Sequence, residues 1–472
     1  MRDWTLALLA LAQLIISIDY NIVYVALPDI GAGLHFGAGS LQWVVSAYAV
    51  AFGGFLLFGG RACDRVGPRR VFLAGLLAYG VSSLVGGLAP TPEILIAARA
   101  LQGIGGALLF PATLALISVT FAEGSARNRA FAVWGTAGGS GMILGSLLGG
   151  VLTDVFGWAA VFYVNVPLVL AAVLLARVLL APDATDAAGS GRSFAVPAAV
   201  TATLGISLIV FSIVQGPQTG WTSPTVLAAI ILGAAALAVY RRIDRRSADP
   251  LVPASLIRSA GPRSGAIITF LYMATFGTLL YFLTIYFQTV RGYSPLTTGL
   301  AFLVPMVAIA AGAQLAGRLG GRFDNEMLML LSLVVGGLGI IVLVLTLGAE
   351  SSYLALVPGL VVTGIGQGAG YTLMFGIAAQ GVAPASQGIA AGLASTTQQI
   401  GGAAGLAVLV AVTRLDHLAG ADPAGVTAQI RGALIATIVG IGLTVVVAAA
   451  AVRARRANPI AVPTEHRVTV PA

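Results

Sequence analysis

The chain has 472 residues, of which 58% are hydrophobic and only 9% are charged. Soluble domains carry about 25% charged residues, so a chain this apolar is a poor candidate for a soluble globular enzyme. The 25 basic residues are all arginine, and without lysine the chain can form neither the phosphate-binding loop of an ATPase nor a Schiff base. Its single cysteine, Cys63, excludes an intrachain disulfide and a cysteine-rich metal site.

Fourteen apolar segments follow one another along the chain, and each is long enough to cross a membrane as a helix of about 20 residues. The first is too long for a signal peptide, contains Asp19 and is followed by thirteen others, so we expect it to remain a membrane helix. The predicted fold class is therefore an all-α integral membrane protein. The segments are 4–27, 40–59, 71–90, 94–117, 130–152, 159–180, 195–215, 224–240, 264–288, 297–317, 327–347, 353–378, 388–412 and 432–452.

The arginines predict the orientation of the chain in the membrane. With a cytoplasmic N-terminus, every arginine but four falls in a cytoplasmic segment; the exceptions are Arg99 within a span and Arg291, Arg414 and Arg431 in outer loops. Cytoplasmic loops of membrane proteins carry an excess of basic residues. We therefore expect both termini to be cytoplasmic, and the net charge of +8 needs no nucleic-acid partner.

An internal repeat relates the two halves of the chain. The loops that begin at Gly60 and Gly317 share Gly, Arg and Arg at matching positions, and Gly103-Ile-Gly matches Gly364-Ile-Gly. Because the matching spans are eight apart, a repeat of six helices leaves 195–215 and 224–240 as extra helices. Such repeats are typical of secondary transporters. The predicted divisions are a six-helix bundle over 1–181, two helices with linkers over 182–263, a second bundle over 264–452, and a tail over 453–472.

Two charged residues, Asp19 and Arg99, are predicted to lie inside the membrane. They are about 12 Å and 9 Å from the outer ends of their spans, at 1.5 Å per residue. Charges inside a membrane usually face a cavity or pair with one another, and they are usually functional. We expect Asp19 to face a cavity, to exchange a proton and to pair reversibly with Arg99, whose helix face also carries Gln102. The alternative is a structural acid with a permanent partner and an arginine bonded to backbone carbonyls.

Two glycine-containing motifs predict where helices approach one another. Gly60 opens a short charged loop, where we expect it to allow close helix approach. In the fifth span, Ala137, Gly141, Gly145 and Gly149 recur every four residues, so they form one smooth stripe on which a neighbouring helix can pack and slide. Static packing is the alternative reading of this stripe.

Short motifs recur along the spans and loops of the chain. They are Gly60-x-x-x-Asp64-Arg65-x-Gly67-x-Arg69-Arg70, Asp19 to Pro28, Gln42-Trp43-Val-Val-Ser46-Ala-Tyr48, Arg99-Ala-Leu-Gln102-Gly103, Gly141-x-x-x-Gly145-x-x-x-Gly149-Gly150, Asn165-Val-Pro167 and Gly292-Tyr293-Ser294-Pro295. Together these motifs resemble the major facilitator superfamily, and the fourteen spans resemble its drug:proton antiporter branch of the EmrB/QacA type. The resemblance implies a major facilitator fold of 6 + 2 + 6 helices with two pseudo-symmetric six-helix bundles. Ser146 departs from it, because the family's antiporter motif usually has proline there.

The resemblance implies a proton-coupled antiporter that exports lipophilic, neutral or monocationic drugs, antibiotics or natural products by alternating access. We expect it in the bacterial cell membrane as a monomer, driven by the proton gradient, with no metal and no other cofactor. A proton-coupled importer of a small solute is the alternative. A sensor and an intramembrane enzyme are less favoured, and no Ser/His/Asp or metal-ligand group lies within the spans.

The candidate functional residues fall into three groups. Asp19 and Arg99 are the proton-coupling pair. Aromatic side chains suit flat, lipophilic or cationic ligands, although each can equally be packed in the core or face lipid. The expected ligand contacts are Tyr20, Asn21, Tyr24, Gln42, Trp43, Ser46, Gln102, Asn165, Tyr272 and Phe276. The gate loop and the antiporter motif comprise Gly60, Asp64, Arg65, Gly67, Arg69, Arg70, Gly141, Gly145, Ser146 and Gly149.

Overall fold

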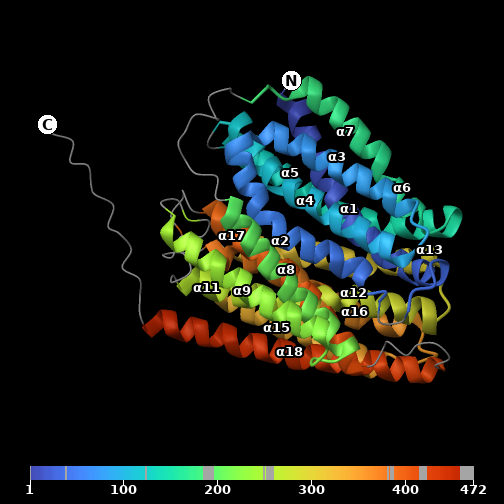
Figure 1. Ribbon diagram of the computed structural model, residues 1–472. Helices are drawn as coiled ribbons and strands as arrows, with labels where there is room; N and C mark the ends of the chain where they lie inside the picture. Colours follow the sequence, from blue (N-terminus) through green and yellow to red (C-terminus); the bar gives the residue numbers. More distant parts are fainter. Residues whose placement is uncertain are drawn as a thin grey trace.

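A computed structural model of the chain is shown in Figure 1. It describes residues 2–37, 40–122, 125–183, 196–247, 250, 260–320, 322–379, 382, 387–413 and 422–457. Within these ranges every regular element is a helix. Fourteen helical segments are long and apolar enough to cross a membrane. The predicted all-α class and the predicted number of spans are therefore confirmed.

The first six spans are built from seven helices, because the sixth span is divided. Gly67 and Pro68 make the tight connection between the second and third helices, and Gly67 has a φ of 100°, which favours glycine. A proline begins the next two helices, where its missing N–H costs nothing. The helices are α1 (Arg2–Gly33), α2 (Trp43–Val66), α3 (Pro68–Gly87), α4 (Pro92–Thr120), α5 (Ser125–Phe156), α6 (Ala160–Tyr163) and α7 (Asn165–Leu179).

Two further spans and six more complete the bundle. Their elements are α8 (Val196–Thr219), α9 (Pro224–Arg246), α11 (Ala260–Thr275), the 3₁₀-helix η2 (Phe276–Thr278), α12 (Leu279–Ile285), the π-helix η3 (Tyr286–Val290), α13 (Pro295–Ala301), α14 (Leu303–Leu319), α15 (Asn325–Thr346), α16 (Tyr353–Ala379), α17 (Gln387–Thr413) and α18 (Pro423–Ala457).

Packing follows the two halves of the chain. In the first half α1 packs on α5, and α4 packs on both α2 and α3; in the second half α16 packs on α14 and α15, and α11 packs on α17. The extra helix α8 packs on α9 and also contacts α2 and α17, so it lies where the two halves meet on one side (Figure 1). The space between the halves is bordered by α1, α2, α4 and α5 on one side and by α11, η2, α12, α14, α16 and α17 on the other.

The two halves touch at the end of the bundle that lies away from the chain ends. The α1 N-terminus and the α18 C-terminus lie at the other end, whereas α6 and α13 lie here (Figure 1). The side-chain Nε2 of Gln288 donates to the carbonyl O of Val25 at 2.7 Å. A Cβ at Gly150 of α5 would lie 2.7 Å from the carbonyl O of Pro295, so α5 and α13 cross with almost no separation.

The ninth span is a broken helix, where the sequence predicts a continuous one over 264–288. The 3₁₀-helix η2, which contains Gly277, interrupts it, and the π-helix η3 ends it. The hydroxyl of Thr275 donates to the carbonyl O of Leu271 at 2.9 Å, and that of Thr278 donates to the carbonyl O of Thr275 at 2.7 Å. Such back-bonding bends helices. A short 3₁₀ stretch inside a helix often marks a hinge, and this one borders the central cavity described below.

Candidate functional site

The predicted intramembrane pair is formed. Arg99 Nη1 on α4 lies 2.7 Å from Asp19 Oδ2 on α1, and the side chains are 2% and 0% exposed. Their predicted depths differ by only about 3 Å along the helix axis, which is why the sequence could place them at one level. The pair is shielded from solvent, so its electrostatic attraction is much stronger than that of a surface ion pair.

Polar groups from four further residues complete a network around the pair. Asn165 Nδ2 donates to Asp19 Oδ1 at 2.7 Å, and Gln102 Nε2 donates to the same oxygen at 2.8 Å. Gln102 also donates to Ser83 Oγ at 2.8 Å and accepts from Arg99 Nη1 at 2.6 Å. Arg99 Nε donates to the carbonyl O of Val44 at 2.9 Å. The carboxylate of Asp19 on α1 is thus bonded to side chains of α4 and α7, and Arg99 on α4 is also bonded to the backbone of α2.

The charge balance of this network makes it sensitive to one proton. In the ionised state Asp19 and Arg99 neutralise each other. If Asp19 takes up a proton, Arg99 becomes a buried cation without a counter-charge, which is costly in a low-dielectric interior. The contact between α1 and α4 at this level therefore depends on the opposite charges of the two side chains.

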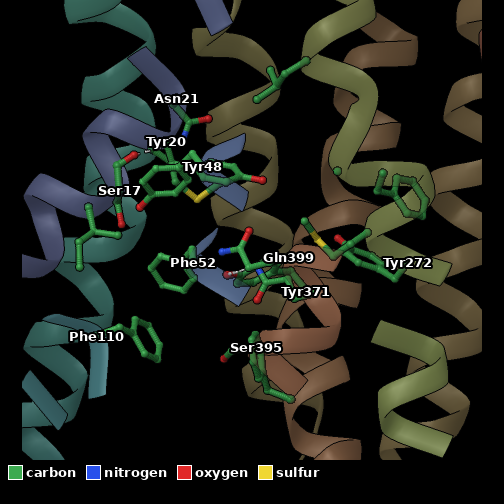
Figure 2. A pocket seen from close by; sticks show the side chains of 18 of the residues that line it. Ser17, Tyr20, Asn21, Tyr48, Phe52, Phe110, Tyr272, Tyr371, Ser395 and Gln399 are labelled. Atoms are coloured by element: carbon green, nitrogen blue, oxygen red, sulfur yellow. Dashed lines mark hydrogen bonds between the residues drawn. The ribbon is translucent and has the colours of Figure 1, made fainter. Parts of the chain in front are cut away.

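Two adjoining chambers lie between the halves of the protein. The small chamber has a volume of about 140 Å³ and is lined by α1, α2, α4 and α5 on one side and by α11, η2, α12, α16 and α17 on the other (Figure 2). The large chamber has a volume of about 490 Å³ and is lined by α1, α4, α5, α14, α16 and α17. They share walls at Ser17, Phe110 and Tyr371. The large chamber also includes Trp134 and Gly135, close to the start of α5.

Four of the ten expected ligand contacts line the small chamber, namely Tyr20, Asn21, Tyr272 and Phe276. The other six lie outside both chamber walls, and ligand contact at them stays a prediction. Gln102 and Asn165 are bonded to Asp19, and Trp43 packs its ring against Phe211 of α8 at a centroid distance of 5.6 Å. The remaining three residues are buried in the protein, namely Tyr24, Gln42 and Ser46.

Asp19 itself lines neither chamber, so the expectation that the acid faces a cavity is wrong for these two cavities. The reason is the geometry of α1. Ser17 and Asn21 line the small chamber, and Asp19 lies two residues from each, which is about 200° around a helix. The acid therefore points to α4 and α7 on the opposite face.

Tyr48 connects the buried pair to the cavity. The Cζ of Arg99 lies 4.5 Å from the centroid of the Tyr48 ring, in cation–π geometry. Tyr48 also lines the small chamber (Figure 2). Its ring packs near Tyr20 and Phe52, with centroids 6.4 and 5.8 Å away. The ring of Tyr48 thus lies between the small chamber and the ion pair.

The loop between α2 and α3 is organised by a residue that the sequence did not reveal. The carboxylate of Asp183, which follows α7, accepts from the backbone N–H groups of Arg69 and Arg70, both at 3.0 Å. A Cβ at Gly67 would collide with this carboxylate. The Asp183 carboxylate is therefore a cap for the α3 N-terminus, where negative charge is favourable. The sequence did not indicate this contact, because Asp183 is more than 100 residues from the loop along the chain.

The other predicted gate residues lie at the end of α2. Arg65 lies in the last turn of α2, and the side chain of Asp64 lies outside the described residues. No described atom lies within 4 Å of a Cβ built at Gly60, so the expected close approach is wrong there. Its neighbour Gly59 makes that approach, because a Cβ at Gly59 would collide with the carbonyl O of Ala107 on α4.

The predicted glycine stripe packs against α1. A Cβ at Gly141 would lie 2.7 Å from Ser17 Cβ, one at Gly145 2.6 Å from Ile18 O, and one at Gly149 2.7 Å from Ile22 O. Close packing is therefore confirmed, and sliding stays a prediction. Ser146 is buried beside this stripe, and its carbonyl O lies 2.6 Å from the Cβ position of Gly299 on α13.

Comparisons with known proteins agree with this architecture. The sequence profile of the Major Facilitator Superfamily matches residues 9–406. The puromycin resistance protein pur8 of Streptomyces alboniger is 35% identical over 95% of this chain and 90% of its own length. The cephamycin export protein CmcT of Amycolatopsis lactamdurans is 38% identical over 86% of this chain and 84% of its own. One solved structure of proton-dependent oligopeptide transporters has a TM-score of 0.66 at 15% identity, covering 96% of this chain and 99% of that chain, and this likeness concerns the fold alone.

Proposed function

This chain belongs to the major facilitator superfamily, and on that basis we propose that it is a proton-coupled antiporter. We propose that it exports lipophilic, neutral or monocationic drugs, antibiotics or natural products by alternating access. The names of its relatives, a puromycin resistance protein and a cephamycin export protein, support this direction of transport. As a member of a transporter family it is not expected to catalyse a covalent reaction.

The buried Asp19–Arg99 pair beside the central chambers is the observation that carries this proposal. The pair, 2.7 Å apart, spans α1 and α4, two helices that also line both chambers. A conformational change that separates α1 from α4 would allow Asp19 to bind a proton. A change that brings the two helices together again would restore the ion pair with Arg99 and release that proton. Proton transfer and cavity shape are thereby linked through the same two helices.

The orientation proposed from the arginines indicates toward which side of the membrane the large chamber lies. We propose that both termini are cytoplasmic and that the protein lies in the bacterial cell membrane as a monomer. The contact between Gln288 and Val25 then lies on the outer side, and the large chamber, which includes Trp134 near the start of α5, lies toward the cytoplasm. This is the arrangement in which an exporter collects its substrate.

Accumulation of dyes and drugs in an efflux-deficient bacterium tests the proposal. We would compare wild type, Asp19→Asn, Asp29→Asn and empty vector at equal membrane expression, each with and without an uncoupler. Asp29 is the matched control, because it lies on the same helix, is half-buried and is absent from the Arg99 network. We expect wild type and Asp29→Asn to lower accumulation, and we expect the uncoupler and Asp19→Asn to abolish the effect.

The other outcomes separate the alternatives. Equal export by wild type and Asp19→Asn would assign Asp19 a structural role and refute its part in coupling. Export that persists with the uncoupler would refute proton drive. Higher accumulation in wild type than in empty vector would indicate a proton-coupled importer of a small solute.

A further inference from the structure

A ladder of three polar side chains runs along the cavity face of α1. Gln13, Ser17 and Asn21 are four residues apart, so they share one helix face, and all three line the small chamber. Each is at most 9% exposed. Helix α5 supports the ladder from the side, because a Cβ at Gly138 would lie 3.0 Å from Gln13 Nε2 and one at Gly141 would lie 2.7 Å from Ser17 Cβ.

The hydrogen bonds within the ladder leave acceptors unused. Asn21 Nδ2 donates to the carbonyl O of Ser17 and Gln13 Nε2 donates to Ser17 Oγ, both at 3.3 Å. A carbonyl oxygen can only accept, which fixes the orientation of the Asn21 amide and leaves Oδ1 as its acceptor. Neither Asn21 Oδ1 nor Gln13 Oε1 has a hydrogen-bond partner among the described residues. Buried acceptors without a partner are rare and unfavourable in proteins.

A matching acceptor lies on the other half of the protein. Gln399 on α17 also lines the small chamber, is 8% exposed, and its Oε1 has no partner among the described residues. Figure 2 shows Gln399 across the chamber from Ser17. Its position is set by Gly53 of α2, whose Cβ position lies 2.9 Å from Gln399 Cβ. Both halves thus place a buried acceptor without a partner in the wall of the small chamber, and a small side-chain rotation would turn either oxygen toward a ligand.

The walls offer no charge to a ligand. Among the described residues that line the two chambers, none is acidic, basic or histidine. The charges of Asp19 and Arg99, on the far side of Tyr48, neutralise each other. A cation entering this space would lose its hydration without meeting a counter-charge, which is unfavourable. An uncharged ligand that donates hydrogen bonds would instead satisfy the unused oxygens.

We propose that the chambers select uncharged ring compounds with at least two hydrogen-bond donors, hydroxyl or amide N–H groups, that bond to the side-chain oxygens of Asn21 and Gln399. The proposal rests on the proposed function and narrows its substrate class. The rings would pack on Tyr20, Phe52 and Tyr272, which line the same chamber.

Equilibrium binding to the purified full-length protein tests this selection separately from transport. The probes are radiolabelled chloramphenicol, which is uncharged and has two hydroxyls and an amide N–H, and two competitors. One competitor is 1,3-diacetylchloramphenicol, in which both hydroxyls are capped without change of charge; the other is tetraphenylphosphonium, a cation without any donor. We expect both competitors to bind at least about tenfold more weakly than chloramphenicol.

Variants assign the binding to the named oxygens. Asn21→Leu and Gln399→Leu should each weaken chloramphenicol binding by about tenfold, whereas Gln215→Leu on α8, outside both chambers, should leave it unchanged. Gln399→Glu keeps the shape and the acceptor but adds a charge, so it should retain chloramphenicol and gain affinity for tetraphenylphosphonium. This gain cannot come from misfolding.

The inference is overturned if wild type binds no chloramphenicol, if the capped compound or tetraphenylphosphonium binds as tightly, or if Asn21→Leu and Gln399→Leu bind like wild type. Selective binding without uncoupler-sensitive efflux would support the ligand class and refute the antiporter. Uncoupler-sensitive efflux of tetraphenylphosphonium, together with unchanged chloramphenicol binding in the variants, would support the antiporter and refute the ligand class.

Discussion

Within the glycine stripe, Gly145 is the position at which an added methyl group would lie closest to its neighbour on α1. A Cβ there would lie 2.6 Å from the carbonyl O of Ile18 and 3.1 Å from Asn21 Cβ. The first neighbour is backbone and cannot rotate away. To reach an ordinary contact of 3.4 Å, α1 and α5 would have to separate locally by about 0.8 Å, in a crossing that depends on close packing.

The size of the effect follows from two opposing contributions. Overpacking typically costs about 1–3 kcal/mol, whereas replacing glycine by alanine inside a helix returns about 1 kcal/mol. Gly139 on the same helix is the matched control, because no described atom lies within 4 Å of its Cβ position. Both alanine variants gain the same helix propensity, so their difference of about 1–3 kcal/mol measures the contact between α5 and α1.

Unfolding of the purified proteins in one detergent, with efflux measured in parallel, provides the assay. Gly145→Ala should unfold more readily than Gly139→Ala and should export less, because Asn21 and the helix that bears Asp19 are displaced. Gly139→Ala should be as stable as wild type or slightly more stable. Equal unfolding of the two variants, or a loss of stability in Gly139→Ala alone, would refute the reasoning about the glycine stripe.

Three further predictions concern contacts around the buried pair and the inner loop. Asn165→Leu removes one donor to Asp19 and should reduce uncoupler-sensitive efflux severalfold at unchanged expression, measured as initial rate; an unchanged rate would contradict a role for this bond. Tyr48→Phe keeps the ring over Arg99 and should export like wild type, whereas Tyr48→Leu removes about 1 kcal/mol of cation–π attraction and should export less; equal rates would argue against the link. Asp183→Ala removes the cap of α3 and should lower the free energy of unfolding by about 1–2 kcal/mol, and an unchanged value in the same unfolding assay would show that the cap contributes nothing.

Much of the architecture follows from the sequence, because membrane spans and their depths depend on local composition. Fourteen apolar segments predict fourteen spans, and the described residues contain fourteen helical segments long and apolar enough to cross a membrane. The depths of Asp19 and Arg99 within their spans place them at one level, and they are in contact. The spacing of Gly141, Gly145 and Gly149 predicts a smooth face, and that face packs on α1.

What the sequence could not provide is the direction in which each helix faces. Gln13 and Ser17 line the chambers, but a polar residue within a span does not by itself indicate whether it faces a cavity or another helix. The close approach at Gly59 rather than Gly60 is a difference of about 100° around one helix. The cap by Asp183 joins segments that are distant in sequence. Such relations depend on tertiary packing.

The two faces of α1 predict that ligand binding and proton coupling can be separated by mutation. Asn21 faces the small chamber, whereas Asp19, two residues away, faces Arg99. Asp19→Asn should therefore abolish uncoupler-sensitive efflux yet retain chloramphenicol binding within about twofold, and Asn21→Leu should weaken binding while the ion pair persists. Gly145→Ala should impair both, because it displaces α1 as a whole. If Asp19→Asn abolished ligand binding in protein that unfolds like wild type, ligand and proton would share one site, and coupling through the movement of α1 would have to be abandoned.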